Sequence, residues 1–208
     1  VDSNNKTSID SAGSLEVGAA GKVDLSGAKV EYSEAGALRL VAGSTDSDAL
    51  KVFAHKNNTF KGAEVVLDSA GGLIFADEAP ITVEASSGKA VLKGQKIDLK
   101  SGSSVKAAGE ATVRGYDSLV LGDNISVGSS SVSITGGQQA FSLGNNVSLT
   151  ATNGGIEVLA DADATLGGSL NVDASLKDPS AGDEAPIRIG AQGVLNVTED
   201  EFEVIAEN

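Results

Sequence analysis

The sequence predicts an all-β protein, and among all-β folds it favours a β-solenoid, in which short strands coil into stacked rungs. Apolar residues recur in pairs two positions apart along the whole chain, and helical spacing is never sustained. Many pairs are followed by another pair after only six to nine residues. A period of two places both members of a pair on the same face of a strand, and the short step leaves room for one corner.

The pairs mark the expected strands in chain order. They are Leu15/Val17, Val23/Leu25, Val30/Tyr32, Leu38/Leu40, Leu50/Val52, Val65/Leu67, Leu73/Phe75, Ile81/Val83, Ile97/Leu99, Leu119/Leu121, Ile125/Val127, Val132/Ile134, Phe141/Leu143, Val147/Leu149, Ile156/Val158, Leu170/Val172, Ile187/Ile189, Leu195/Val197 and Phe202/Val204. Three steps make a coil of about 20–24 residues, which is the range of repeat architectures. The alternative is an antiparallel β-sandwich or jelly roll, because regularly spaced alternating strands are also typical of that class.

Glycine and the aliphatic residues fit the narrow interior and tight corners of a solenoid. The chain has 26 Gly, no Trp and only 3% aromatic residues. We therefore expect a thin core of Val, Leu, Ile and Ala that leaves no room for larger rings. Tight corners often need positive φ, which Gly and Asn adopt at low cost. The expected corner residues are Gly27, Gly94, Gly115, Gly122, Gly128, Gly136, Gly137, Gly144 and Asn145.

We expect one elongated β domain over residues 1–208. Polar, irregular stretches near 43–48, 54–63 and 176–186 are predicted to be loops that project from corners. The acidic C-terminal segment 198–208 is expected to be a capping strand or a partner-binding tail.

The charge distribution excludes some partners and favours others. A net charge of −14 argues against nucleic-acid binding, and no apolar run is long enough for a membrane-spanning helix. Residues 145–208 carry 12 acids and 2 bases, whereas 89–115 carry six bases, namely Lys89, Lys93, Lys96, Lys100, Lys106 and Arg114. Such asymmetry suits contacts between copies of the chain.

Candidate chemical residues are few. The single histidine, His55, stands in FAHKNNTF without a nucleophile motif, so we assign no catalytic residue and expect no enzyme. Carboxylate pairs at Asp46/Asp48 and Asp161/Asp163 are weak candidates for Ca²⁺, because such sites use oxygen clusters, but no known Ca²⁺ loop motif is present. Otherwise no cofactor is expected. The absence of Cys excludes thiolate sites.

Five N-x-S/T sequences are candidate glycosylation sites, at Asn5, Asn57, Asn124, Asn146 and Asn196. Composition alone predicts about two such sequences in a chain with this much Asn, Ser and Thr, and these residues are also common at corners. Both interpretations remain open.

The rhythm of SLEVGAAGKVDLSGAKVEYS (14–33) and KAVLKGQKIDLKSGSSVKAAGEATVRG (89–115) resembles the haemagglutinin-type repeats of filamentous bacterial adhesins. These repeats occur in the two-partner secretion and autotransporter passenger group. The resemblance implies a right-handed parallel β-helix exposed on a cell surface as a stalk, adhesin or fibre.

These observations lead to three functional expectations. The first is an extracellular structural protein, a self-assembling subunit of a cell-surface fibre, sheath or surface layer, which polymerises through sheet edges and solenoid ends. The second is a surface adhesin that binds a surface glycan or host ligand through the loops at 54–63 or 176–186. The third, ranked last, is a β-helix enzyme acting on polysaccharides.

Overall fold

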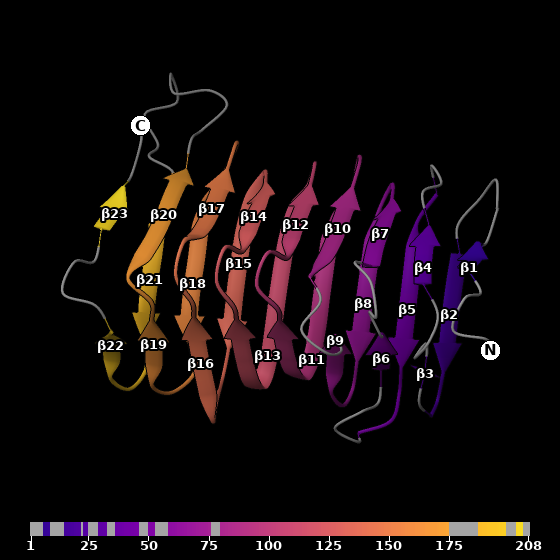
Figure 1. Ribbon diagram of the computed structural model, residues 1–208, viewed down its shortest axis with the longest axis horizontal. Helices are drawn as coiled ribbons and strands as arrows, with labels where there is room; N and C mark the ends of the chain where they lie inside the picture. The colour runs from indigo at the N-terminus through magenta and orange to yellow at the C-terminus, as the bar shows by residue number, and fades with distance from the viewer. Residues whose placement is uncertain are drawn as a thin grey trace.

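The protein is an all-β solenoid whose parallel strands stack coil upon coil into an elongated rod. In Figure 1 the long axis of the rod lies horizontally and the strands run across it, from β1 and β2 at one end to β22 and β23 at the other. The computed structural model describes residues 6–8, 15–21, 23–24, 29–32, 36–45, 50–52, 58–75, 80–174, 187–198 and 203–205. No helix occurs among these residues.

Three faces surround the core, and each coil contributes one strand segment to each face. Face 1 is a nine-stranded sheet in the order β1 (Lys6–Ser8), β4 (Lys29–Tyr32), β7 (Asn58–Gly62), β10 (Ile81–Ala85), β12 (Ser104–Ala107), β14 (Ser126–Ser129), β17 (Val147–Ala151), β20 (Ser169–Ala174) and β23 (Glu203–Ile205).

Face 2 is formed by β2 (Leu15–Ala19), β5 (Leu38–Ala42), β8 (Val65–Ser69), β11 (Ala90–Leu99), β13 (Glu110–Leu121), β15 (Ser131–Gly136), β18 (Ile156–Ala160) and β21 (Ile187–Ala191). Face 3 is formed by β3 (Val23–Asp24), β6 (Leu50–Val52), β9 (Leu73–Phe75), the second halves of β11 and β13, β16 (Ala140–Leu143), β19 (Ala164–Leu166) and β22 (Leu195–Val197).

The strand register confirms the predicted coil length in the middle of the rod. Residues 82, 104, 126 and 148 are consecutive partners on face 1, a spacing of 22 residues. Longer steps occur between Leu38 and Val65 and between Ile156 and Ile187. These steps contain residues 46–49, 53–57 and 175–186, which lie outside the described residues. All the described strand pairs are parallel, so the antiparallel sandwich is excluded.

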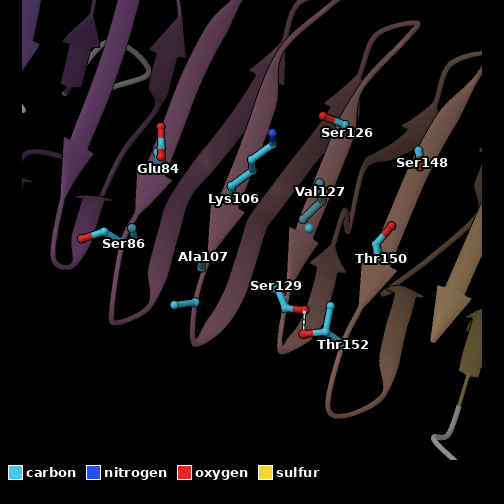
Figure 2. A pocket seen from close by; sticks show the side chains of 13 residues that line it. Glu84, Ser86, Lys106, Ala107, Ser126, Val127, Ser129, Ser148, Thr150 and Thr152 are labelled. Atoms are coloured by element: carbon cyan, nitrogen blue, oxygen red, sulfur yellow. Dashed lines mark hydrogen bonds between the residues drawn. The ribbon is translucent and has the colours of Figure 1, made fainter. Parts of the chain in front are cut away.

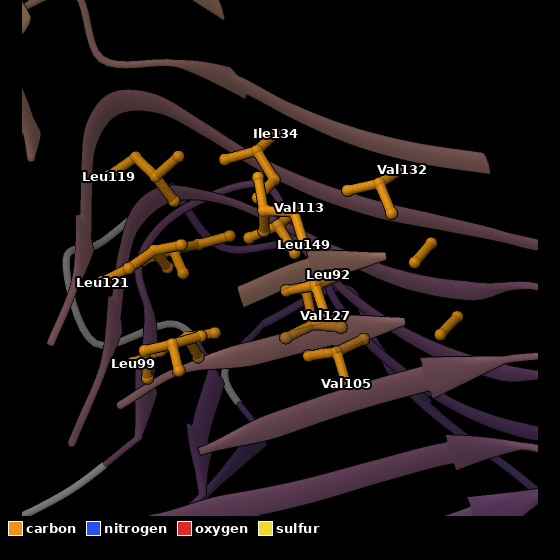
Figure 3. Packing of buried hydrophobic residues seen from close by; sticks show 14 of the residues in the cluster. Leu92, Leu99, Val105, Val113, Leu119, Leu121, Val127, Val132, Ile134 and Leu149 are labelled. Atoms are coloured by element: carbon orange, nitrogen blue, oxygen red, sulfur yellow. The ribbon is translucent and has the colours of Figure 1, made fainter. Parts of the chain in front are cut away.

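Inward side chains form apolar columns along the rod, one residue per coil, as the packed side chains in Figure 3 illustrate. On face 1 the column runs through Phe60, Val83, Val105, Val127, Leu149 and Val172; on face 2 it runs through Leu40, Leu67, Leu92, Val113, Ile134 and Val158. All twelve side chains are at most 2% exposed. Like residues therefore stack on like, which fixes the register of each coil on the one before it.

Three local expectations were wrong. Within the loop predicted at 54–63, Asn58–Gly62 form strand β7, whereas residues 54–57 lie outside the described residues. Phe60 and Phe141 are buried at 0% and 3% exposure, so the core does accept aromatic rings. Gly128 is not a corner residue, because it lies within strand β14.

The predicted loop at 176–186 and the corner at Gly27 lie outside the described residues, as do residues 46–48 of the loop predicted at 43–48. The acidic segment 198–208 contains β23, which pairs with β20 and extends face 1.

Tight corners connect face 2 to face 3. Strands β11 and β13 bend from one face to the other, with a register shift between Gly94 and Lys96. At the next two coils, Gly115 is the register partner of Gly136, whose φ is 120°. A Cβ on Gly136 would lie 1.9 Å from the carbonyl oxygen of Gly115, so only glycine fits at this point of the turn.

Candidate functional site

The strongest candidate site is a shallow groove with a mixed polar and apolar lining on the outer surface of face 1, which crosses strands β10, β12, β14 and β17 (Figure 2). It has a volume of about 540 Å³. Its polar lining includes Glu84, Lys106, Ser126, Ser148 and Thr150. Because it crosses successive strands, the groove runs along the rod rather than across it, and parallel strands lie about 4.8 Å apart.

Two outward columns of face 1 supply these side chains. The first is a row of hydroxyl groups from Thr82, Ser104, Ser126 and Ser148, which are consecutive register partners. The second column lies two residues further along each strand and contains Lys61, Glu84, Lys106, Gly128, Thr150 and Asp173. Both columns project outward because successive residues of a strand point to opposite sides, and the apolar residues between them fill the core.

Charge alternates at the start of the second column. Lys61 Nζ lies 2.6 Å from Glu84 Oε2. The hydrogen bond and charge of Lys61, followed by the charge of Lys106, hold the pKa of Glu84 below its ordinary value. Lys106 Nζ makes no ion pair with any described residue, although its charge acts on Glu84, which also lines the groove.

A second group of polar residues lies at the corners and has a structural role. The Oδ1 atom of Asp123 accepts a hydrogen bond from the backbone N–H of Asn145 at 2.7 Å, and Asn145 Oδ1 accepts one from Gly168 N–H at 2.7 Å. In the same way, Asp163 Oδ1 accepts a hydrogen bond from Val194 N–H at 2.8 Å. Each side chain thus satisfies a backbone donor of the next coil, which a turn otherwise leaves unpaired.

Two of the candidate glycosylation residues are corner residues of this kind. Asn124 and Asn146 both have a φ of 56°, which non-glycine residues other than Asn and Asp rarely adopt. They lie one coil apart, and Asn146 Nδ2 donates a hydrogen bond to Asn124 Oδ1 at 3.3 Å. Both are exposed. The turn therefore gives a structural reason for Asn at these positions. Asn196 is exposed on β22, and Asn5 and Asn57 lie outside the described residues.

Of the predicted metal ligands, only Asp161 and Asp163 lie in the described part of the chain. Asp163 Oδ1 already accepts a hydrogen bond from the backbone N–H of Val194. In the described part of the chain, no group of three or more His, Cys, Asp or Glu side chains could hold a metal ion. Asp161 lies near Asp163 in sequence at the same corner, whereas Asp46, Asp48 and His55 lie outside the described residues.

The basic stretch 89–115 does not form one patch. Lys93 and Arg114 are register partners in an outward column of face 2, whereas Lys106 belongs to face 1 and Lys100 pairs with Asp98 at 2.6 Å beyond the strand end of face 3. The guanidinium of Arg114 lies over the Tyr116 ring, 5.0 Å from its centroid. The positive charges therefore encircle the rod.

The last described coil exposes residues that elsewhere belong to the core. Leu195 and Val197 on β22 are 43% and 39% exposed, although their register partners Ala164 and Leu166 on β19 are each 1% exposed. The neighbouring Val194 is 58% exposed. The inward columns of face 3 thus end at an open apolar edge.

Sequence reasoning missed the groove, and it predicted open solenoid ends without indicating that Leu195 and Val197 would be exposed there. The groove depends on which residues become outward neighbours one coil apart, and the only local signal is a glycine at an outward position of a strand, Gly128 in SVGS. No protein-family model, curated protein or solved structure matches the chain. In the described residues, no helix is long and apolar enough to cross a membrane.

Proposed function

We propose that this protein is a structural rod, a subunit of an extracellular fibre, sheath or surface layer that assembles through the ends of its solenoid. The observation that carries the proposal is the open edge at β22, where Leu195 and Val197 are exposed at positions that belong to the core one coil earlier. An apolar edge with free backbone groups favours pairing with another chain. The resemblance of the repeats to those of filamentous surface proteins supports the extracellular location.

The strand count constrains how a second copy would join. Face 1 has nine described strands and begins with β1 and ends with β23, whereas faces 2 and 3 each have eight strand segments. A second copy that stacks its β2 and β3 on β21 and β22 in register would place its β1 where β23 pairs with β20. In-register assembly therefore requires β23 to leave that position, and removal of residues 199–208 should promote it.

Electron microscopy of the purified chain over a range of protein and salt concentrations tests the proposal. We expect rods longer than one chain, and longer or more numerous rods without residues 199–208. Leu195→Lys should shorten or abolish them, because it places a charge in the apolar junction. Asn196→Lys is the matched control, since Asn196 is an outward residue of the same strand. Dispersed monomers for every variant under all conditions would contradict the assembly proposal.

Location is tested separately on the source cells. Antibody labelling and protease treatment of intact cells should detect the protein at the surface. Signal that appears only after cell lysis would contradict an extracellular role, whatever the electron microscopy shows.

A second candidate function, a surface-binding module, is favoured by the groove on face 1. Polar side chains from four strands line it, and Lys106 carries a charge that no described residue pairs. A rod that holds such a groove at a cell surface would present it to soluble or neighbouring ligands. This function and the structural one are compatible, because the groove lies on a side of the rod and the apolar edge at its end.

A further inference from the structure

Gly128 lines the groove and contributes no side chain to it. It lies in strand β14 at an outward position between Lys106 and Thr150 of the neighbouring coils. A Cβ at Gly128 would have no atom within 4 Å, and its φ is not in the positive region. Neither packing nor backbone conformation therefore requires glycine here.

Glycine at such a position weakens a strand, by about 0.5–1 kcal/mol relative to alanine. The other described members of this column, Lys61, Glu84, Lys106, Thr150 and Asp173, all carry side chains. The missing side chain leaves an opening in an otherwise filled row. A residue that lowers the stability of its strand and is not required by packing or backbone conformation is typical of a functional position.

The surroundings of this opening define the chemistry of a ligand. Lys106 borders it with an ammonium group that makes no ion pair with any described residue, while the neighbouring Glu84, on which its charge also acts, pairs with Lys61. Ser126 and Ser148 flank it with hydroxyl groups from the adjacent column, and Thr150 adds a third from the next coil. None of the described residues that line the groove is aromatic. These groups fit an extended, hydroxyl-rich chain that carries negative charge.

We propose that the groove binds an acidic polysaccharide of the uronic-acid class along the axis of the rod. A carboxylate of the sugar chain pairs with Lys106, and sugar hydroxyls exchange hydrogen bonds with Ser126, Ser148 and Thr150 over the open surface at Gly128. The inference rests on the second candidate function and gives its ligand class.

Because the protein has a large negative net charge, binding of a polyanion in the groove depends on the positive charge of Lys106. With a formal charge of −14, most of the surface repels a polyanion. A polyanion therefore binds only where a local cation offsets this repulsion, and loss of that cation removes the attraction. Added salt should weaken binding, because the groove is open and its charges are screened.

Isothermal titration of the purified chain with an α-1,4-linked tetragalacturonate tests the proposal, with maltotetraose as the neutral probe and tetraglutamate as the acidic peptide probe. We expect saturable, salt-sensitive binding of tetragalacturonate and at least about tenfold weaker binding of the other two, since each lacks either the charge or the sugar hydroxyls.

Gly128→Thr fills the opening, and Lys106→Gln removes the charge. Each should weaken tetragalacturonate binding by about tenfold, the loss expected for one charged hydrogen bond or one blocked contact. Gly18→Thr is the matched control for the first, because a Cβ at Gly18 on face 2 also meets nothing within 4 Å. Lys96→Gln is the control for the second, because Lys96 is exposed on β11. Neither control should change the affinity.

Several outcomes would overturn the inference. These are no binding of tetragalacturonate, equal binding of tetraglutamate, unchanged affinity in Gly128→Thr or Lys106→Gln, or equal losses in the control variants. Circular dichroism of each variant verifies that the fold is kept. Because assembly is scored by electron microscopy on the same proteins, failure of binding with intact rods refutes only this inference, and binding by dispersed monomers refutes only the structural role.

Discussion

Two glycine-to-alanine substitutions in the same coil should change stability in opposite directions. Gly136 and Gly128 are only eight residues apart in the sequence, and both were expected at corners. The structure separates them, because Gly136 has a φ of 120° at the turn between faces 2 and 3, whereas Gly128 is an extended strand residue that faces solvent.

The magnitude for Gly136→Ala follows from two costs. A Cβ at this position would lie 1.9 Å from Gly115 O and 2.7 Å from Gly115 C, which are backbone atoms of the preceding coil. The turn must shift, and Gly115 O also accepts a hydrogen bond from Gly137 N–H at 2.7 Å. A strained backbone costs about 1–3 kcal/mol and a weakened hydrogen bond about 1 kcal/mol, so we expect a loss of about 2–4 kcal/mol.

Gly128→Ala should have the opposite effect. Its Cβ enters open space, and alanine restricts the unfolded chain more than glycine does. The free energy of unfolding should rise by up to about 1 kcal/mol. Urea denaturation followed by circular dichroism measures both variants against the parent chain. Losses of equal size in the two variants would refute the register and the turn geometry on which this reasoning depends.

Three further predictions concern the core, a corner and a surface ion pair. Leu92→Ala should lower the free energy of unfolding by about 2–5 kcal/mol in urea denaturation, because Leu92 is fully buried. In the same assay, Asn146→Ala should cost about 1 kcal/mol through its positive φ, whereas Asn146→Gly should cost at most a few tenths. The pKa of Glu84 is lower in the folded protein than in the unfolded chain, so the ionised carboxylate stabilises the fold at a pH above the pKa of the unfolded chain. This stabilisation is lost as the pH falls through the pKa of the folded protein. Because Lys61 and Glu84 are both exposed, the parent should exceed Glu84→Gln in melting temperature only slightly at pH 7, and that difference should shrink as the pH falls below the ordinary pKa of a glutamate.

The inward half of the structure was predictable from the sequence because burial imposes a rule on each residue. Pairs such as Ile134 with Val132 had to be apolar and two positions apart, and the core columns then followed from stacking. Strand β7 was not predicted, because it lacks such an apolar pair. Its inward residues are Phe60 and Gly62, so the second member of the pair has no side chain, and the polar residues around them resembled a loop.

The outward half was not predictable, because solvent accepts almost any side chain. Whether Lys106 lies beside Gly128 or beside Thr150 depends on a coil length of 22 residues, which no local pattern specifies. Gly128 was assigned to a corner because glycine in a short sequence window signals a turn. Only the register distinguishes a glycine at a corner from a glycine at an outward strand position, where it leaves the surface without a side chain.

The register that orders the core also decides what kind of partner can use the surface. Outward groups repeat from coil to coil at the strand spacing of about 4.8 Å, so a chain lying along face 1 meets one hydroxyl group of the same column at each of four successive coils, from Thr82 to Ser148. A compact ligand touches only one or two of these groups and gains little from the repeat. Because identical coils would let such a chain slide, a fixed binding position needs a coil that differs from its neighbours. The unpaired charge of Lys106 beside the open position at Gly128 provides that difference, and it occurs once in the described part of this column.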